Sequence, residues 1–178
     1  DSSRADPVQP GPILGVLMSL TEYAVLIAEP DARLRATLGN ELAPLGCTVF
    51  QAENGPTALR ILAEQQVRVV MSELYLRTGD EDCLIKAIRG NKSLRNTRAL
   101  AHTRFATARD RDWAMTVGAD AYLIHPTRGD RLRYVVARLA TERSGGGSGA
   151  VVPPSAAPAS AAAAPVATKR RPKSPYKA

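Results

Sequence analysis

Short apolar runs alternate with longer segments of helical spacing between residues 22 and 143 of this 178-residue chain. The apolar runs have the length of buried strands; they span residues 23–28, 47–52, 67–73, 98–102 and 121–124. Helical spacing of apolar residues predicts helices at about 31–45, 107–117 and 128–141, a helix that opens at Asn54-Gly55-Pro56, and another that carries Leu84, Ile85 and Ile88. Strands that alternate with helices lie parallel, so the pattern predicts an α/β domain.

Two of the predicted strands end in a glutamate. Glu29 follows the run that begins at Val25, and Glu73 follows the run that begins at Val67. In a parallel sheet, ligands collect at the carboxyl ends of the strands. We therefore expect both carboxylates to lie at one edge of the sheet, where they form a candidate chemical site.

The segments on either side of this domain differ from it in composition. Residues 1–21 are Pro-, Asp- and Ser-rich at their start, and we interpret them as a disordered N-terminal extension or vector remnant. Residues 144–178 are rich in Gly, Ala, Pro and Ser, which predicts a disordered linker. This segment contains no acid and supplies five cations of a chain whose net charge is +7; they are Lys169, Arg170, Arg171, Lys173 and Lys177. Such a tail can bind nucleic acid weakly and without sequence preference, or it can be a solvated linker.

The cysteines and the hydropathy indicate a cytoplasmic protein. Cys47 and Cys83 have neither CxxC nor metal-type spacing, so we expect reduced thiols. No apolar stretch approaches the roughly 20 residues of a membrane-spanning helix, and we expect no membrane partner.

Three stretches of the chain resemble the receiver domain of bacterial response regulators. They are residues 25–31 followed by Arg35, residues 47–59, and residues 118–126, the last being close to the family's Gly-Ala-Asp-x-Tyr-Leu-x-Lys-Pro signature. The resemblance covers residues 22–141. It implies a flavodoxin-like fold: a doubly wound, five-stranded parallel sheet of order 2-1-3-4-5 with helices on both faces.

The resemblance also implies a site at which several positions depart from the family pattern. Members transfer a phosphoryl group to an aspartate with the help of Mg²⁺, a pair of acidic residues, a hydroxyl and a lysine. Here Glu73 stands at the aspartate position, Glu29 keeps one acid of the pair, and Pro30 replaces the other. His102 is placed at the hydroxyl position and His125 at the lysine position.

These departures predict that the chemistry is lost. The Glu73 carboxylate lies roughly 1.5 Å further out than that of an aspartate, and a misplacement of about 1 Å can cost ~100-fold in rate. Pro30 offers no carboxylate, and His125 is only partly charged near neutral pH. We therefore predict a pseudo-receiver that is not an enzyme, holds no cofactor and binds Mg²⁺ weakly or not at all.

Several alternatives remain open for these side chains. Glu73 either imitates a phosphorylated aspartate permanently or is a relic with no switching role. His125 can pair with Glu73 or Glu29 in place of the lysine. With His102, these residues also include the types found in transition-metal sites.

The function that we predict is a protein-protein interaction module that works without phosphorylation. The resemblance implies a partner surface formed by the fourth helix, the fifth strand and the fifth helix, with a homodimer as one possible use. The candidate residues on it are Trp113, Tyr122, Arg131 and Tyr134. The alternative is the receiver half of an atypical transcription regulator, in which the basic tail or an output domain contacts DNA.

Overall fold

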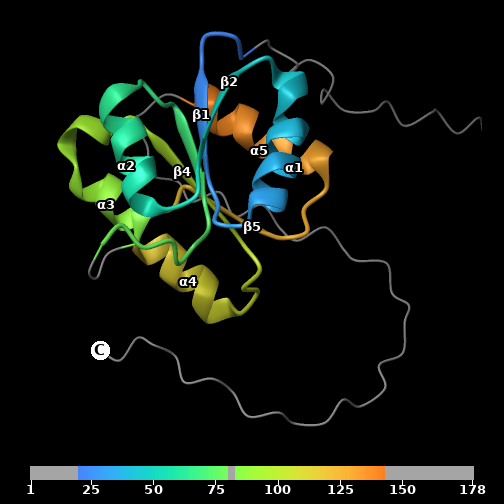
Figure 1. The fold of residues 1–178 in the computed structure, drawn as a ribbon. Helices are drawn as coiled ribbons and strands as arrows, with labels where there is room; N and C mark the ends of the chain where they lie inside the picture. The colour runs from blue at the N-terminus through green and yellow to red at the C-terminus, as the bar shows by residue number, and fades with distance from the viewer. Residues whose placement is uncertain (1–19, 80–82, 143–178) are drawn as a thin grey trace, which may run out of the picture.

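The computed structural model describes residues 20–79 and 83–142, which fold as a parallel sheet between two layers of helices (Figure 1). The five strands pair in the order β2-β1-β3-β4-β5, so the predicted fold class is confirmed. The strands are β1 (Ala24–Ala28), β2 (Thr48–Ala52), β3 (Val69–Ser72), β4 (Arg98–Thr103) and β5 (Ala121–Ile124). The helices are α1 (Ala32–Leu42), η2 (Ala43–Leu45), α2 (Gly55–Glu64), α3 (Leu84–Gly90), η3 (Lys92–Leu94), α4 (Ala108–Thr116) and α5 (Gly129–Thr141).

Three of the α-helices, α1, α2 and α4, begin where a polar side chain accepts from the free backbone amides of the first turn. Asp31 caps α1, and Asn54 caps α2 ahead of the proline in its first turn. Thr107 and Asp110 form a capping box at α4. The sequence predicted one helix over 31–45, but α1 ends at Leu42 and continues as the 3₁₀ turn η2. Pro44 explains the break, because proline lacks the amide that an α-helix needs there.

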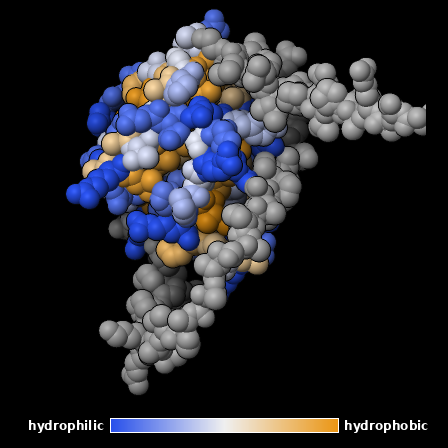
Figure 2. Space-filling model, turned by 90° about the vertical axis from the view of Figure 1, so that its right-hand side faces the viewer, coloured by the Kyte–Doolittle hydropathy of each residue, from blue (hydrophilic) through white to orange (hydrophobic). Residues whose placement is uncertain are grey.

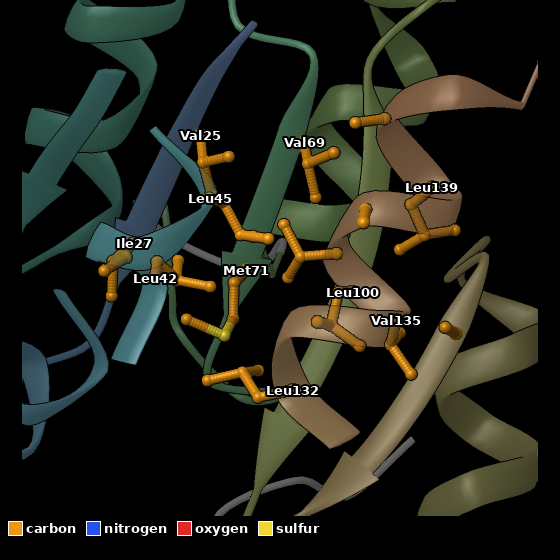
Figure 3. Close-up of a cluster of buried hydrophobic side chains, with 14 of the residues drawn as sticks. Val25, Ile27, Leu42, Leu45, Val69, Met71, Leu100, Leu132, Val135 and Leu139 are labelled. Atoms are coloured by element: carbon orange, nitrogen blue, oxygen red, sulfur yellow. The ribbon is translucent and has the colours of Figure 1, made fainter. Parts of the chain in front are cut away.

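The core lies on both faces of the sheet. Alternate residues of β1, β3, β4 and β5 pack against α1, η2 and α5, and Figure 3 shows this cluster, with Met71 and Leu100 facing Leu132 and Val135. The remaining strand residues pack against α2, α3 and α4 in two further clusters. Figure 2 views the α1 and α5 side, where the outer surface is mostly hydrophilic. Each helix of this layer therefore places its apolar side toward the sheet.

Several expectations concern residues outside those that the structure describes. Residues 1–19 of the predicted N-terminal extension, the linker and all five cations of the basic tail belong to this group. Leu20, which the prediction assigned to the extension, is described: it is 1% exposed in the core cluster of α1 and α5, and its amide donates to the Leu45 carbonyl at 2.9 Å. The folded domain therefore begins no later than Leu20, and the predicted start at residue 22 was too late. Within residues 20–79 and 83–142, no helix is long and apolar enough to cross a bilayer. Cys47 and Cys83 are not joined in a disulfide.

Candidate functional site

The two glutamates come together at the carboxyl edge of the sheet. Glu29 directly follows β1 and Glu73 directly follows β3, and these strands are neighbours. The Glu73 amide donates to the Ala28 carbonyl at 3.0 Å, which extends the ladder beyond the last strand residue. The charges of the two carboxylates are close enough to interact.

Glu29 is a buried carboxylate. The residue is only 5% exposed, and its Oε1 accepts from the Asp31 amide at 2.9 Å. Burial raises the pKa of Glu29, the amide of Asp31 opposes that rise, and the negative charge of Glu73 adds to it. The positive charge of Arg104 works in the opposite direction. Glu29 is therefore easier to protonate than an ordinary surface glutamate.

Glu73 is held by two hydrogen bonds. Its Oε1 accepts from the amide of Leu74 at 2.9 Å and from the hydroxyl of Thr103 at 2.6 Å. Thr103 is the last residue of β4, the neighbour of β3. The carboxylate is thus fixed between the ends of two strands rather than free in solvent.

The hydroxyl beside Glu73 comes from Thr103, and the placement of His102 at the hydroxyl position was wrong. Successive side chains of a strand point to opposite faces, so a shift of one residue moves the group to the other side of the sheet. Leu100, two residues earlier, packs in the α1 and α5 layer, and His102 has the same parity. His102 is 2% exposed, and its Nε2 has no hydrogen-bond partner among the described residues.

His125 lies beside His102 rather than bonding to a glutamate. The two ring centroids are 5.5 Å apart and the ring planes meet at 68°. Among the described residues, the His125 ring makes no hydrogen bond or ion pair with Glu29 or Glu73. Burial, followed by the charge of His125, lowers the pKa of His102 to about 4, so His102 is neutral at physiological pH.

Two neighbouring polar side chains at this edge, Asp31 and Arg35, are engaged in other contacts. The Asp31 carboxylate accepts from the amides of Arg33 and Leu34 at 2.9 and 3.0 Å as the cap of α1. The Arg35 guanidinium donates to the backbone carbonyls of Glu29 and Pro30. No group of three or more His, Cys, Asp or Glu residues in the described ranges is arranged to hold a metal ion.

The surface around β5 exposes large apolar side chains, although not all of the expected ones. Tyr134, on α5, is 47% exposed, while Trp113 and Tyr122 are half-buried. The Tyr122 hydroxyl donates to the Phe105 carbonyl. Phe105 is 49% exposed and Ile124, at the end of β5, is 43% exposed.

A family model described as Response regulator receiver domain matches residues 25–137. The chain belongs to this family. Solved receiver structures agree with the fold. The receiver domain of a signal transduction histidine kinase from Syntrophus aciditrophicus is 24% identical, with a TM-score of 0.60 over 66% of this chain and 89% of that one. A response regulator from Thermotoga maritima is 21% identical, with a TM-score of 0.60 over 67% and 98% of the two chains. The chemotaxis response regulator CheY4 of Vibrio cholerae is 21% identical, with a TM-score of 0.60 over 66% and 98%. A comparison with curated proteins found no match.

Membership makes this chain a receiver domain of two-component signalling. The structure in turn shows which site and surface residues the sequence analysis missed. Thr103, Phe105 and Ile124 were overlooked, and Arg131 lies half-buried on α5. The sequence could have identified Thr103 as the hydroxyl residue of the site, because it is the first hydroxyl-bearing residue after the strand that begins at Arg98. Phe105 lies on the loop after β4, and Ile124 is the last residue of the edge strand β5; both are large, exposed apolar residues.

Proposed function

We propose that this receiver domain is a pseudo-receiver, which binds a partner protein without being phosphorylated. The observation that carries the proposal is the Thr103-Glu73 hydrogen bond of 2.6 Å. A receiver hydroxyl is expected to grip a phosphoryl oxygen, and here it already binds a carboxylate oxygen of the side chain at the acceptor position. The contact favours Glu73 as a permanent stand-in for the phosphorylated aspartate rather than a relic.

The surroundings of Glu73 support the loss of phosphoryl transfer. Mg²⁺ prefers near-octahedral oxygen ligands. Pro30 supplies no side-chain oxygen, Asp31 caps α1, and Glu29 is buried with a raised pKa. The His125 ring packs against His102, and among the described residues it makes no hydrogen bond to Glu29 or Glu73. The proposal therefore includes weak or absent Mg²⁺ binding and no enzymatic activity.

The partner surface that we propose is the side of the domain around β5, one of the two edge strands of the sheet. Phe105, Ile124 and Tyr134 are exposed there, on the β4-α4 loop, on β5 and on α5. Contiguous apolar patches on a surface mark interaction sites, and aromatic anchors dominate many interfaces. We name these three residues the β5 patch.

A phosphorylation assay tests the first half of the proposal. The full chain is incubated with acetyl phosphate and Mg²⁺, and intact mass is recorded. We expect no phosphoryl adduct on the wild type or on Glu73→Asp, because Pro30 and His125 also fail the chemistry. The triple variant Glu73→Asp, Pro30→Asp, His125→Lys is the positive control. A stable, Mg²⁺-dependent adduct on the wild type or on Glu73→Asp alone would refute the proposal.

A binding comparison tests the second half once a partner has been isolated. Phe105→Ala and Tyr134→Ala should weaken binding, since each removes an exposed anchor of the β5 patch. If Glu73 is a stand-in, Glu73→Ala should weaken it as well, whereas a relic would leave it nearly unchanged. Glu53→Ala, at an exposed position after β2, is the matched acidic control. Binding that survives both aromatic substitutions would place the interface elsewhere.

A further inference from the structure

Helix α4 is weakly anchored by its own residues. Of its nine residues only Ala114 is buried, with Trp113 and Met115 packed at the margin of the same cluster. By comparison, α5 buries most of the residues on its inner side; they are Leu132, Val135, Val136, Ala137, Leu139 and Ala140. Apolar burial is the main source of stability for a surface helix, so α4 needs other contacts to keep its position.

Tyr75 supplies such contacts from the loop that follows Glu73. Its hydroxyl donates to Asp110 Oδ1 at 2.6 Å, across 35 residues of sequence. Its ring stacks on Trp113, with centroids 5.2 Å apart and planes at 29°. It also meets the ring of Phe105 edge-on, at 5.0 Å and 83°. One side chain thus touches the first turn of α4, the middle of α4 and the loop before it.

The acceptor of the Tyr75 hydroxyl is the carboxylate that starts α4. Asp110 Oδ2 accepts from the Thr107 hydroxyl at 2.5 Å, and the Asp110 amide donates to Thr107 Oγ1 at 3.1 Å. The hydrogen bonds from Thr107 and then Tyr75 lower the pKa of Asp110, so the acceptor is ionised. A hydrogen bond to a charged group is stronger than one between neutral groups. Tyr75 therefore bonds to the capping box itself.

We infer that Tyr75 is a positioning residue that locks α4, and with it the Phe105 end of the β5 patch, in one arrangement regardless of the state of Glu73. The inference deepens the proposed function, because it says how the partner face stays formed without phosphate. The Thr103-Glu73 bond reaches only the end of β4. Tyr75, in contrast, contacts Asp110 and Trp113 of α4 directly, and it also contacts Phe105 on the loop before α4.

The chain carries its own reporter for this lock. Trp113 is the only tryptophan in the sequence, and it is the residue that Tyr75 stacks on. Fluorescence quenching by acrylamide therefore measures the exposure of α4 alone. Hydrogen exchange of residues 108–116 measures the opening of the same helix through its backbone amides.

The experiment compares full-length variants by both measurements. Tyr75→Phe removes only the hydroxyl and should speed exchange in α4 about tenfold to a hundredfold, the loss expected for one hydrogen bond to a charged group. Tyr75→Ala also removes the ring and should speed exchange further and raise quenching of Trp113. Tyr134→Phe and Tyr134→Ala are matched controls on α5 and should leave α4 unchanged. Exchange in α5 serves as the internal control for global stability.

The outcomes separate the lock from the proposed function. If Tyr75→Phe leaves α4 exchange unchanged, or if Glu73→Ala loosens α4 as much as Tyr75→Ala does, the lock is refuted. If Tyr75→Ala fails to fold, Tyr75→Phe still decides the question, since it keeps the ring. Phosphate uptake by the wild type would refute the pseudo-receiver proposal and would leave the result on α4 standing.

Discussion

His102 should make the domain less stable as the solution is acidified. The residue is 2% exposed, and its Nε2 has no hydrogen-bond partner among the described residues. Charging an imidazole in such a place is costly because nothing replaces the water that it loses. Burial, and then the charge of His125, lower the pKa of His102 from 6.5 to about 4 in the folded chain.

The sign and size of the effect follow from this difference. Between pH 6.5 and 4 the unfolded chain binds a proton at His102 that the folded chain refuses, so acid favours unfolding. Each pKa unit corresponds to about 1.4 kcal/mol, which gives roughly 3 kcal/mol lost once the pH reaches 4. About 1 kcal/mol of this should already be missing at pH 5.5. Above pH 7 the penalty disappears.

Urea unfolding at pH 7.5 and pH 5.5 measures this loss, and His102→Leu is the matched variant because it keeps the site apolar without a titratable group. The other titrating groups, Glu29 among them, remain in both proteins, so their effects cancel in the comparison. We expect the free energy of unfolding of the wild type to fall by about 1 kcal/mol more than that of His102→Leu over this interval. Equal losses in the two proteins would refute a buried, neutral His102.

Two further predictions concern stability. The Asp120 carboxylate binds the guanidinium groups of Arg89 and Arg98 at 2.5 and 3.0 Å and accepts from the Ala99 amide at 2.7 Å. Asp120→Ala should therefore lower the free energy of unfolding by roughly 3 kcal/mol in urea titration, and a loss under 1 kcal/mol would contradict that reasoning. Gly55→Ala would place a Cβ 2.0 Å from the carbonyl oxygen of Arg77 and should cost about 1–3 kcal/mol in urea titration. Gly90→Ala, with open space around its Cβ, should be neutral or slightly stabilising in the same titration, and an equal loss in both variants would contradict the steric argument.

The fold could be predicted from the sequence because its signals are local. Short apolar runs and helical spacing indicate the strands and helices directly, and capping residues such as Asp31 and Thr107 mark where helices begin. The boundary at Leu42 was misplaced because the apolar spacing continues to Leu45, past a proline that breaks the hydrogen-bond pattern. The position of Glu29 and Glu73 at the same edge of the sheet was predictable for a geometric reason, since parallel strands bring their carboxyl ends to one edge.

The remainder of the site depended on information that sequence patterns carry poorly. β4 contains few β-branched residues, so its last residue could not be assigned, and an error of one position exchanged His102 for Thr103. The Tyr75 contacts join residues 30 to 38 positions apart, and no periodic pattern links them. The packing of Trp113 likewise depends on Tyr75, which lies on the loop after β3, and apolar spacing does not predict the course of that loop.

The exchange of His102 for Thr103 changes what would be needed to rebuild a phosphorylation site. With the hydroxyl placed at His102, repair requires a fourth substitution, His102→Thr. The Thr103 hydroxyl already lies 2.6 Å from the carboxylate at the acceptor position, so that substitution is superfluous. It would instead replace a buried ring of the α1 and α5 layer with a smaller polar side chain. Adding His102→Thr to the Glu73→Asp, Pro30→Asp, His125→Lys variant should therefore lower stability without raising phosphate uptake, and a large rise in uptake would return the hydroxyl role to position 102.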